Sequence, residues 1–322
     1  MSKPKTEKEL YYSLLRIRLI EFEISKRYPE GKMRCPVHLS IGQEAIPVGI
    51  CNWLTDEDQI VSAHRSHAHY LAKGGNLKAM MGEIYGRKTG CARGNGGSMH
   101  LIDPSVGMVA AVPIVGSSVP IAVGLAFSNK LKSNNCVVAV FFGDGAAEEG
   151  TFHESLNFAT LHQLPILFVC ENNDFSVYTS LDKRQSPKRK IADIAASHGV
   201  QTVHDDGNNV YKVSAIAKNA VEFIREKNAP FFLELDTYRW LEHCGPGNDD
   251  HLNYRDGKKV QAWVKRDPVK LAEEFLLGKK LATEVELAKF KAKIEREIAE
   301  SFEFAESSKF PEKSDLYKFI YQ

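Results

Sequence analysis

The sequence lacks several features that would assign it to a specialised class of protein. Only six of its 322 residues are cysteine, and no two of them form a CxxC pair. This excludes a disulfide scaffold, and we expect reduced thiols that mostly fill the core. The 42 basic and 41 acidic residues nearly cancel, so charge indicates neither a nucleic-acid partner nor a membrane surface.

Long apolar runs are also missing. No stretch approaches the ~20 apolar residues of a membrane span, and the N-terminal MSKPKTEKEL has no apolar segment typical of a secretory signal. We therefore expect a cytoplasmic protein that does not enter the membrane. With 43% hydrophobic and 26% charged residues, the composition is that of an ordinary globular protein.

Helical periodicity marks both ends of the chain. We expect helices over residues 6–28, 43–54, 77–86 and 283–305. The first and last of these begin with capping boxes, formed by Thr6 with Glu9 and by Thr283 with Glu286. Residues 87–113 are rich in glycine and predict a long loop, and loops of this length in compact domains are usually functional.

Strands and helices alternate regularly in the middle of the chain. We expect helices over 117–132, 150–162, 190–198 and 210–227, and strands over 137–142, 166–171, 201–204 and 231–237. Short apolar strands between helices predict an α/β fold with a doubly wound parallel sheet covered on both faces. The expected organisation is one domain, 1–322, with a helical extension (1–60), an α/β core (60–240) and a helical tail (260–322).

Polar residues follow two successive strands of this sheet. The GDG at 143–145 ends one strand, and 26 residues (146–171) separate it from the NN at 172–173. Neighbouring parallel strands end at one edge of the sheet, where such folds bind ligands. Asp144 and Asn173 should therefore meet. Carboxylate and amide oxygens suit Mg²⁺ or Ca²⁺, which would in turn hold a diphosphate.

The turn after the first strand would also contact the phosphate directly. We expect Gly145 and Ala146 to open the next helix and to point their N–H groups at the phosphate. Either motif alone is also a common turn, because Asp, Asn and Gly favour turns. The pair at adjacent strand ends is what favours a metal-bound diphosphate.

These motifs resemble those of a known family. The GDG followed 26 residues (146–171) later by NN is similar to the thiamine diphosphate-binding motif. The segments GCARGNGGSMHLID, IVGSSVPIAVGLA and LELDTYRW resemble the alpha subunit of pyruvate- or acetoin-type 2-oxo acid dehydrogenases, the thiamine-dependent component. The resemblance covers about residues 10–305. It implies thiamine diphosphate and Mg²⁺ as cofactors, a 2-oxo acid or acetoin as substrate, and a lipoyl group as acyl acceptor.

The resemblance also assigns individual residues. It implies that Asp144, Asn173 and the backbone carbonyl of Phe175 bind Mg²⁺. The implied cofactor contacts are His38, His64, Arg65, Pro113, Val115, Asp144, Gly145, Ala146, Asn173, Phe175 and His243. The family usually has glycine where Pro113 stands, so this position has lost an N–H donor. The resemblance places His38 and His243 at the reacting centre, and we expect them to transfer protons because imidazole titrates near neutral pH.

Three histidines in AHRSHAHYLAKGG (63–75) raise an alternative, a zinc site. His64 and His67 would point to opposite faces, however, and a closed zinc site that also used His69 would still need a fourth ligand. The resemblance instead places His64 and Arg65 on the diphosphate. Tyrosine is common at position 64 in pyruvate enzymes, whereas HRxHxH is more similar to acetoin enzymes.

The resemblance implies a partner chain. In this family a separate beta subunit carries the pyrimidine-binding domain and its activating glutamate, so we expect activity only in an alpha2-beta2 heterotetramer, with a lipoyl acyltransferase as a further partner. Two alternatives stay open. The segment GPGNDDHLNYRDGK (245–258) differs from the usual lipoyl-facing loop, which allows a thiamine-dependent carboligase or aldehyde transferase of sugar or secondary metabolism. The other alternative is a non-catalytic assembly subunit.

Overall fold

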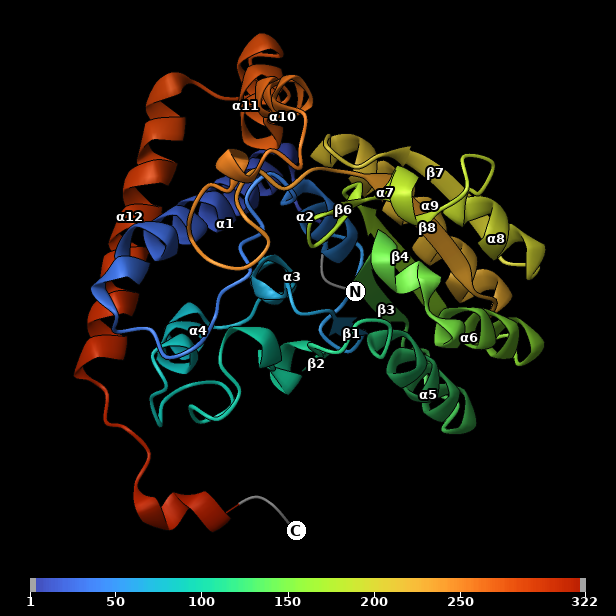
Figure 1. Ribbon diagram of the computed structural model, residues 1–322, viewed down its shortest axis with the longest axis horizontal. Helices are drawn as coiled ribbons and strands as arrows, with labels where there is room; N and C mark the ends of the chain where they lie inside the picture. The colour runs from blue at the N-terminus through green and yellow to red at the C-terminus, as the bar shows by residue number, and fades with distance from the viewer. Residues whose placement is uncertain (1–3, 319–322) are drawn as a thin grey trace.

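A computed structural model describes residues 4–318 and shows a six-stranded parallel sheet between layers of helices (Figure 1). The strands are β1 Gln59–Ser62, β2 Met108–Ala111, β3 Val138–Gly143, β4 Ile166–Asn172, β7 Gln201–Asp206 and β8 Phe231–Asp236. Their order is β2-β1-β3-β4-β8-β7, and every neighbouring pair is parallel. The predicted α/β fold is confirmed.

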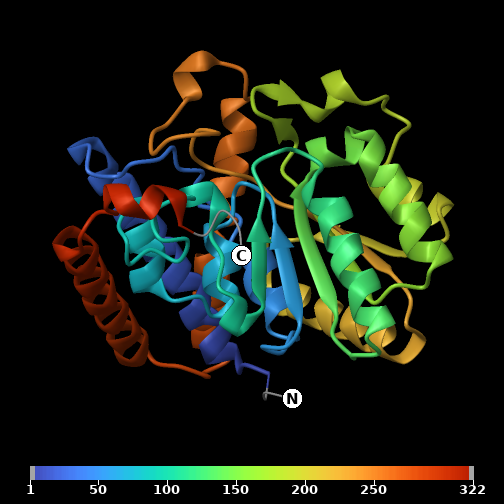
Figure 2. The same cartoon turned by 90° about the horizontal axis from the view of Figure 1, so that it is seen from below.

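Alternate side chains of the central strands enter two hydrophobic cores, one on each face of the sheet. Along β3, Ala139 and Phe141 pack into the first core, whereas Val140 and Phe142 pack into the second. The first core includes α1 Glu7–Arg27, α2 Ala45–Cys51, α3 His67–Lys73, α4 Leu77–Ile84, α9 Val210–Lys227 and α12 Glu284–Ser307; the second includes α5 Ser118–Leu131, α6 Gly150–Leu161 and α8 Ile191–Ser197. Figure 2 shows the green helices α5 and α6 on one side of the sheet and the blue and red helices on the other.

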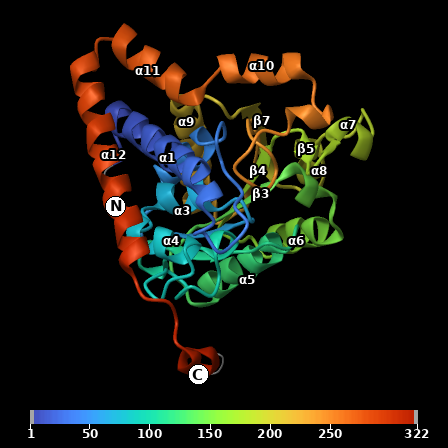
Figure 3. The same cartoon turned by 60° about the vertical axis from the view of Figure 1, so that its left-hand side comes forward.

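The two long terminal helices lie side by side. Both begin at the predicted capping boxes, in which the Thr6 and Thr283 side chains accept the N–H groups of Glu9 and Glu286. Helix α12 packs along α1 and α4 (Figure 3). The tail also contains α10 Gly257–Lys265 and α11 Pro268–Gly278. The expected extension and tail include residues 1–3 and 319–322, which lie outside the described residues.

Two local expectations are wrong. Residues 87–113 are not one structureless loop, because they contain 3₁₀ turns at Ser98–His100 and Pro104–Val106 and the edge strand β2. Gly145 and Ala146 do not open an α-helix. They lie in the 3₁₀ turn Asp144–Glu148, which extended backbone at Glu149 separates from α6.

All six cysteines are free. Cys51 lies in the first core and Cys170 in the second, and the half-buried Cys35 and Cys91 pack against the first core. Cys136 is half-buried and Cys244 is exposed. Most of the thiols therefore lie in or against a core, as predicted. Within the described residues, no helix combines the length and apolarity needed to cross a bilayer.

A buried carboxylate organises the glycine-rich loop. Glu83 on α4 accepts the backbone N–H groups of Ala92, Gly94, Gly96 and Gly97 at 2.7–3.0 Å. Gly94 and Gly97 have φ angles of 80° and 65°, in the left-handed region that favours glycine. The glycines thus allow the loop to wrap its N–H groups around one side chain, and the loop ends near Met99, beside the cavity described next.

Candidate active site

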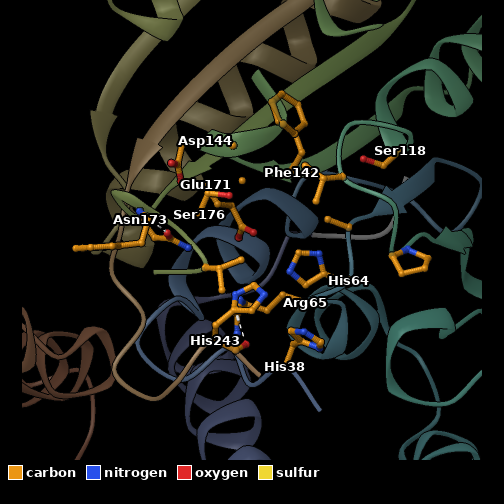
Figure 4. Close-up of a pocket in the computed structure, with 18 of the residues that line it drawn as sticks. His38, His64, Arg65, Ser118, Phe142, Asp144, Glu171, Asn173, Ser176 and His243 are labelled. Atoms are coloured by element: carbon orange, nitrogen blue, oxygen red, sulfur yellow. Dashed lines mark hydrogen bonds between the residues drawn. The ribbon is translucent and has the colours of Figure 1, made fainter. Parts of the chain in front are cut away.

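The ends of β3 and β4 meet at one edge of the sheet, as predicted. Gly143 of β3 pairs with Glu171 of β4, and this register brings Asp144 and Asn173 to one cavity (Figure 4). Asp144 is 1% exposed, and its Oδ1 has no hydrogen-bond partner among the described residues. Burial raises the pKa of Asp144, and the positive charge of Arg184 opposes this shift. A buried carboxylate oxygen without a partner is suited to bind a cation.

A positive group already faces this carboxylate. Arg184, from the short helix α7 Leu181–Arg184, forms ion pairs with Asp144 and Glu148. A Cβ atom at Gly145 would lie 2.8 Å from Ser176 Oγ and 3.7 Å from Arg184 Nη1. Glycine therefore keeps this turn open, and the electrostatics of the turn favour positive charge. Both properties fit a Mg²⁺–diphosphate site.

All eleven residues that the family resemblance assigned to the cofactor line this single cavity. They are His38, His64, Arg65, Pro113, Val115, Asp144, Gly145, Ala146, Asn173, Phe175 and His243. At the Asn173 amide, Oδ1 accepts the N–H of Phe175 at 3.1 Å, and Nδ2 donates to Gln43 Oε1 at 3.3 Å. These bonds hold the amide at the cavity wall. The individual roles of the eleven residues toward a cofactor stay predictions.

Three imidazoles from separate segments gather in the same cavity, away from Asp144 (Figure 4). The ring centroids of His38 and His64 are 4.7 Å apart, and those of His38 and His243 are 5.1 Å apart. Burial, reinforced by the charge of Arg65, lowers the pKa of His38 to about 2, of His64 to about 4 and of His243 to about 3. All three rings are therefore neutral at pH 7.

Arg65 ties together the segments that carry two of these histidines. Its Nη1 donates to the carbonyl of Leu39 at 2.5 Å, and its Nη2 donates to the carbonyl of His243 at 3.2 Å. Burial, together with the nearby Arg239, lowers the pKa of Arg65 to about 10, so the side chain stays charged at neutral pH. Arg65 thus positions the backbone next to His38 and at His243.

The other two histidines of the HRxHxH segment have separate partners. His67 is buried between Glu21 Oε1 at 2.5 Å and Ser98 Oγ at 2.6 Å. His69 Nδ1 lies 2.7 Å from Ser62 Oγ, and its Nε2 lies 3.3 Å from Glu171. Because His67 and His69 are engaged by separate partners, and the ligand atoms of His64, His67 and His69 do not gather at one point, these three histidines do not form a zinc site.

Buried ion pairs fix the loop that carries His243. Asp249, 2% exposed, pairs with Arg255 at 2.5 Å and with Arg239 at 3.6 Å. Tyr254 donates a hydrogen bond to Asp249 and accepts one from Arg239 at 2.7 Å. Ion pairs and hydrogen bonds within the segment GPGNDDHLNYRDGK, and between it and Arg239, therefore hold the segment in place.

Sequence reasoning missed several residues of the cavity. His69 and Glu171 both line it. Glu171 stands immediately before the Asn172–Asn173 pair. Its place at the end of the same strand could have predicted that it lines the cavity. Arg184 lies beyond an irregular segment, and nothing in its spacing indicates that it reaches Asp144.

The fold and the cavity are those of an α/β protein with a ligand-sized site at the carboxyl ends of its strands. The model of the dehydrogenase E1 component family matches residues 12–314. The chain therefore belongs to this family, as an alpha-type subunit of a thiamine diphosphate-dependent oxidoreductase, and the family predicted from the motifs is confirmed.

Individual relatives agree with the family match. The chain is 37% identical to chloroplastic pyruvate dehydrogenase E1 component subunit alpha-3 of Arabidopsis thaliana, over 97% of this chain and 74% of that protein. It is 33% identical to pyruvate dehydrogenase E1 component subunit alpha of Rickettsia felis, over 99% and 97% of the two chains. It is 36% identical to the alpha subunit of acetoin:2,6-dichlorophenolindophenol oxidoreductase of Bacillus subtilis, over 97% and 92%. Similarity therefore extends to proteins named for pyruvate and to one named for acetoin.

Proposed function

We propose that this chain acts on a 2-oxo acid such as pyruvate, or on acetoin, within an alpha2-beta2 heterotetramer, and passes the acyl group to the lipoyl group of an acyltransferase. The observation that carries the proposal is the convergence of Asp144, Asn173 and three neutral imidazoles on one cavity. Its free thiols support a reducing, cytoplasmic location.

The cofactor's tail would be held at the strand ends. Asp144, Asn173 and the Phe175 carbonyl would bind Mg²⁺, and the N–H groups of Gly145 and Ala146 would contact the diphosphate. The Asp144 carboxylate supports this assignment, because Arg184 pairs with Oδ2 and leaves the buried Oδ1 without a partner among the described residues. The backbone at Pro113 and Val115 would face the aminopyrimidine, on the cavity wall where both lie.

The reacting end of the cofactor would lie among the histidines. Thiamine diphosphate, when bound, supplies a thiazolium carbon that bonds to the substrate carbonyl. His38 and His243 would donate a proton to the substrate oxygen and accept it back, because neutral imidazole offers both a donor and an acceptor. Arg65 would keep both histidines in position through its bonds to Leu39 and His243.

An apolar surface beside the cavity supports a beta subunit as partner. Large exposed hydrophobic residues cluster on α5, on α6 and just before α5, namely Ile114, Val115, Ile121, Leu131, Phe158 and Leu161. Gly124 on α5 faces open space, so another helix could approach closely there. Monomeric proteins rarely expose such apolar clusters, whereas subunit interfaces bury them.

The proposal is tested with the chain coexpressed with a beta subunit of the same family. We expect the purified complex to reduce an artificial electron acceptor with pyruvate, 2-oxobutyrate, a branched 2-oxo acid or acetoin, only when thiamine diphosphate and Mg²⁺ are present. The Asp144→Ala complex should assemble but lose this activity. An assembled complex that is inactive on all four substrates and forms a carbon–carbon bond with an added aldehyde would support the carboligase instead. Full activity of the Asp144→Ala complex would contradict the proposed metal site.

A further inference from the structure

The histidine cluster has the composition of a transition-metal site. One ligand nitrogen from each of His38, His64 and His243 lies within 4.8 Å of the other two. In a tetrahedral zinc site with Zn–N bonds of about 2.0–2.1 Å, the nitrogens are roughly 3.4 Å apart. Small rotations of the three side chains would therefore bring the rings into zinc geometry. Figure 4 shows His38, His64 and His243 near one another, with Arg65 among them.

Within residues 4–318, no hydrogen bond engages the rings of His38, His64 and His243. His38 is 6% exposed, and its Nδ1 has no hydrogen-bond partner in this part of the chain. Among the described residues, no side-chain hydrogen bond ends on the rings of His64 or His243 either. His67, by contrast, is bonded through both ring nitrogens. The cluster thus keeps its lone pairs available inside the cavity.

We propose that His38, His64 and His243 bind Zn²⁺ in the cofactor-free protein, and that the bound zinc excludes the cofactor from this end of the cavity. Three imidazoles with a fourth position open toward the cavity match the zinc sites in which three histidines bind the metal and water takes the fourth position. This goes beyond the proposed function, in which the cavity holds only Mg²⁺, at Asp144. Imidazole nitrogens favour zinc over magnesium, whereas carboxylate and amide oxygens favour magnesium.

The residues around the three histidines weaken the binding of Zn²⁺ but do not block the ring nitrogens. The positive charge of Arg65 opposes a second cation nearby. Its Nη1 and Nη2 point at the carbonyls of Leu39 and His243, however, and leave the ring nitrogens free. The zinc site is therefore expected to be reversible, so that excess cofactor can displace the metal.

Among the residues that the structure describes, one other cluster of potential ligands serves as an internal control. His204, Glu234 and Asp236 also lie within 4.8 Å of one another. Glu234, however, accepts hydrogen bonds from Asn172 Nδ2 and from the N–H of Ala192, both at 2.8 Å. Its carboxylate is already engaged, so we do not expect this cluster to compete for zinc.

The test uses the full chain, stripped of metal with a chelator and without cofactor. Titration with Zn²⁺ alone should saturate at one ion per chain, and Co²⁺ alone should give the intense visible absorption of a tetrahedral site. Each of His38→Ala, His64→Ala and His243→Ala should weaken Zn²⁺ binding by more than about 100-fold, because losing a ligand costs more than losing an outer partner. His162→Ala, at a histidine outside the cavity, should bind like the unmodified chain.

Folding and site identity are checked separately. Circular dichroism establishes that each variant is folded, and His64→Gln provides a second variant if His64→Ala is not. Adding thiamine diphosphate with Mg²⁺ should release the bound Co²⁺ and abolish its absorption. Failure to bind Zn²⁺, binding lost only in His204→Ala, or binding unaffected by all three cavity variants would each overturn the proposal. None of these readouts requires catalytic activity, so their failure would leave the proposed function standing.

Discussion

At the scale of single residues, the contact between Arg184 and Asp144 connects stability with cofactor binding. The Asp144 carboxylate is buried, and Arg184 is its charged partner in the absence of metal. Removing one member of a buried pair leaves the other charge uncompensated. Arg184 thus stabilises the empty site, and it must share or release the carboxylate when a cation binds there.

We therefore predict that Arg184→Gln destabilises the cofactor-free chain by about 3 kcal/mol, the order expected for breaking a buried pair. Urea unfolding without added metal measures this change in the free energy of unfolding. Lys183→Gln, one position earlier on the exposed side of α7, is the matched control and should change stability little. Equal stability of the Arg184→Gln and Lys183→Gln variants would show that the ion pair does not stabilise the empty site.

The three cavity histidines make stability depend on pH. Their pKa values in the folded chain lie below the ordinary value of 6.5 because they are buried. The unfolded chain therefore takes up protons first as the pH falls, so the folded state loses stability from about pH 7 downward. For His38 alone the loss at pH 5 is about 2 kcal/mol relative to pH 8.

This prediction is checked by urea unfolding at several pH values between 8 and 5. His38→Asn should reduce the dependence and leave the part due to His64 and His243, because asparagine does not titrate in this range. Replacing the half-buried His162 outside the cavity with Asn is the control and should keep the slope of the unmodified chain. If the free energy of unfolding rose as the pH fell through 6, the buried imidazoles would not destabilise the folded chain as predicted.

At the scale of elements, the glycine-rich loop depends on one side chain of α4. Each oxygen of the Glu83 carboxylate accepts two backbone N–H groups of the loop. Glutamine would replace one oxygen with a donor and leave two N–H groups without an acceptor, at about 1–3 kcal/mol each. We predict that Glu83→Gln lowers the free energy of unfolding by about 3 kcal/mol and speeds amide exchange over residues 92–97.

Hydrogen exchange followed by mass spectrometry measures the loop, and urea unfolding measures the stability. Glu295→Gln, on the exposed side of α12, is the control for the same chemical change. Unchanged exchange in the loop of Glu83→Gln would mean that the glycines hold their conformation without the carboxylate.

Regular elements could be predicted from local patterns in the sequence. The capping boxes at Thr6 and Thr283 fixed where α1 and α12 begin, because side-chain capping depends on residues three apart. Strand periodicity placed Asp144 and Asn173 at one edge of the sheet. Arg184 and Glu83 could not be found in this way, because their partners are brought to them by loops whose path depends on tertiary contacts.

At the scale of the whole molecule, the cavity and the exposed apolar surface lie on adjoining elements. Ile114 is 69% exposed and lies next to Val115, which lines the cavity. A partner bound to the α5–α6 surface would therefore also close the cavity. Cofactor binding and subunit assembly are thus expected to stabilise each other, because both bury the rim of the cavity at Ile114 and Val115.

Leu161 at the end of α6 allows the proposed subunit interface to be tested. Its side chain is 73% exposed, so Leu161→Glu should leave the isolated chain folded while placing a charge in the proposed interface. We predict that it weakens association with the beta subunit by at least about 30-fold, the effect of losing one interface hot spot. Sedimentation equilibrium of the mixed subunits measures this association.

The control for this prediction is a similar change on another face. Val285 is 65% exposed and lies on α12, a helix on the opposite side of the fold from α6 (Figure 1). Val285→Glu therefore alters charge and exposed apolar area in a comparable way. It should associate with the beta subunit like the unmodified chain. If Val285→Glu disrupted the complex and Leu161→Glu did not, the beta subunit would bind the helical tail instead. The cavity would then have to be closed by loops of the alpha chain itself.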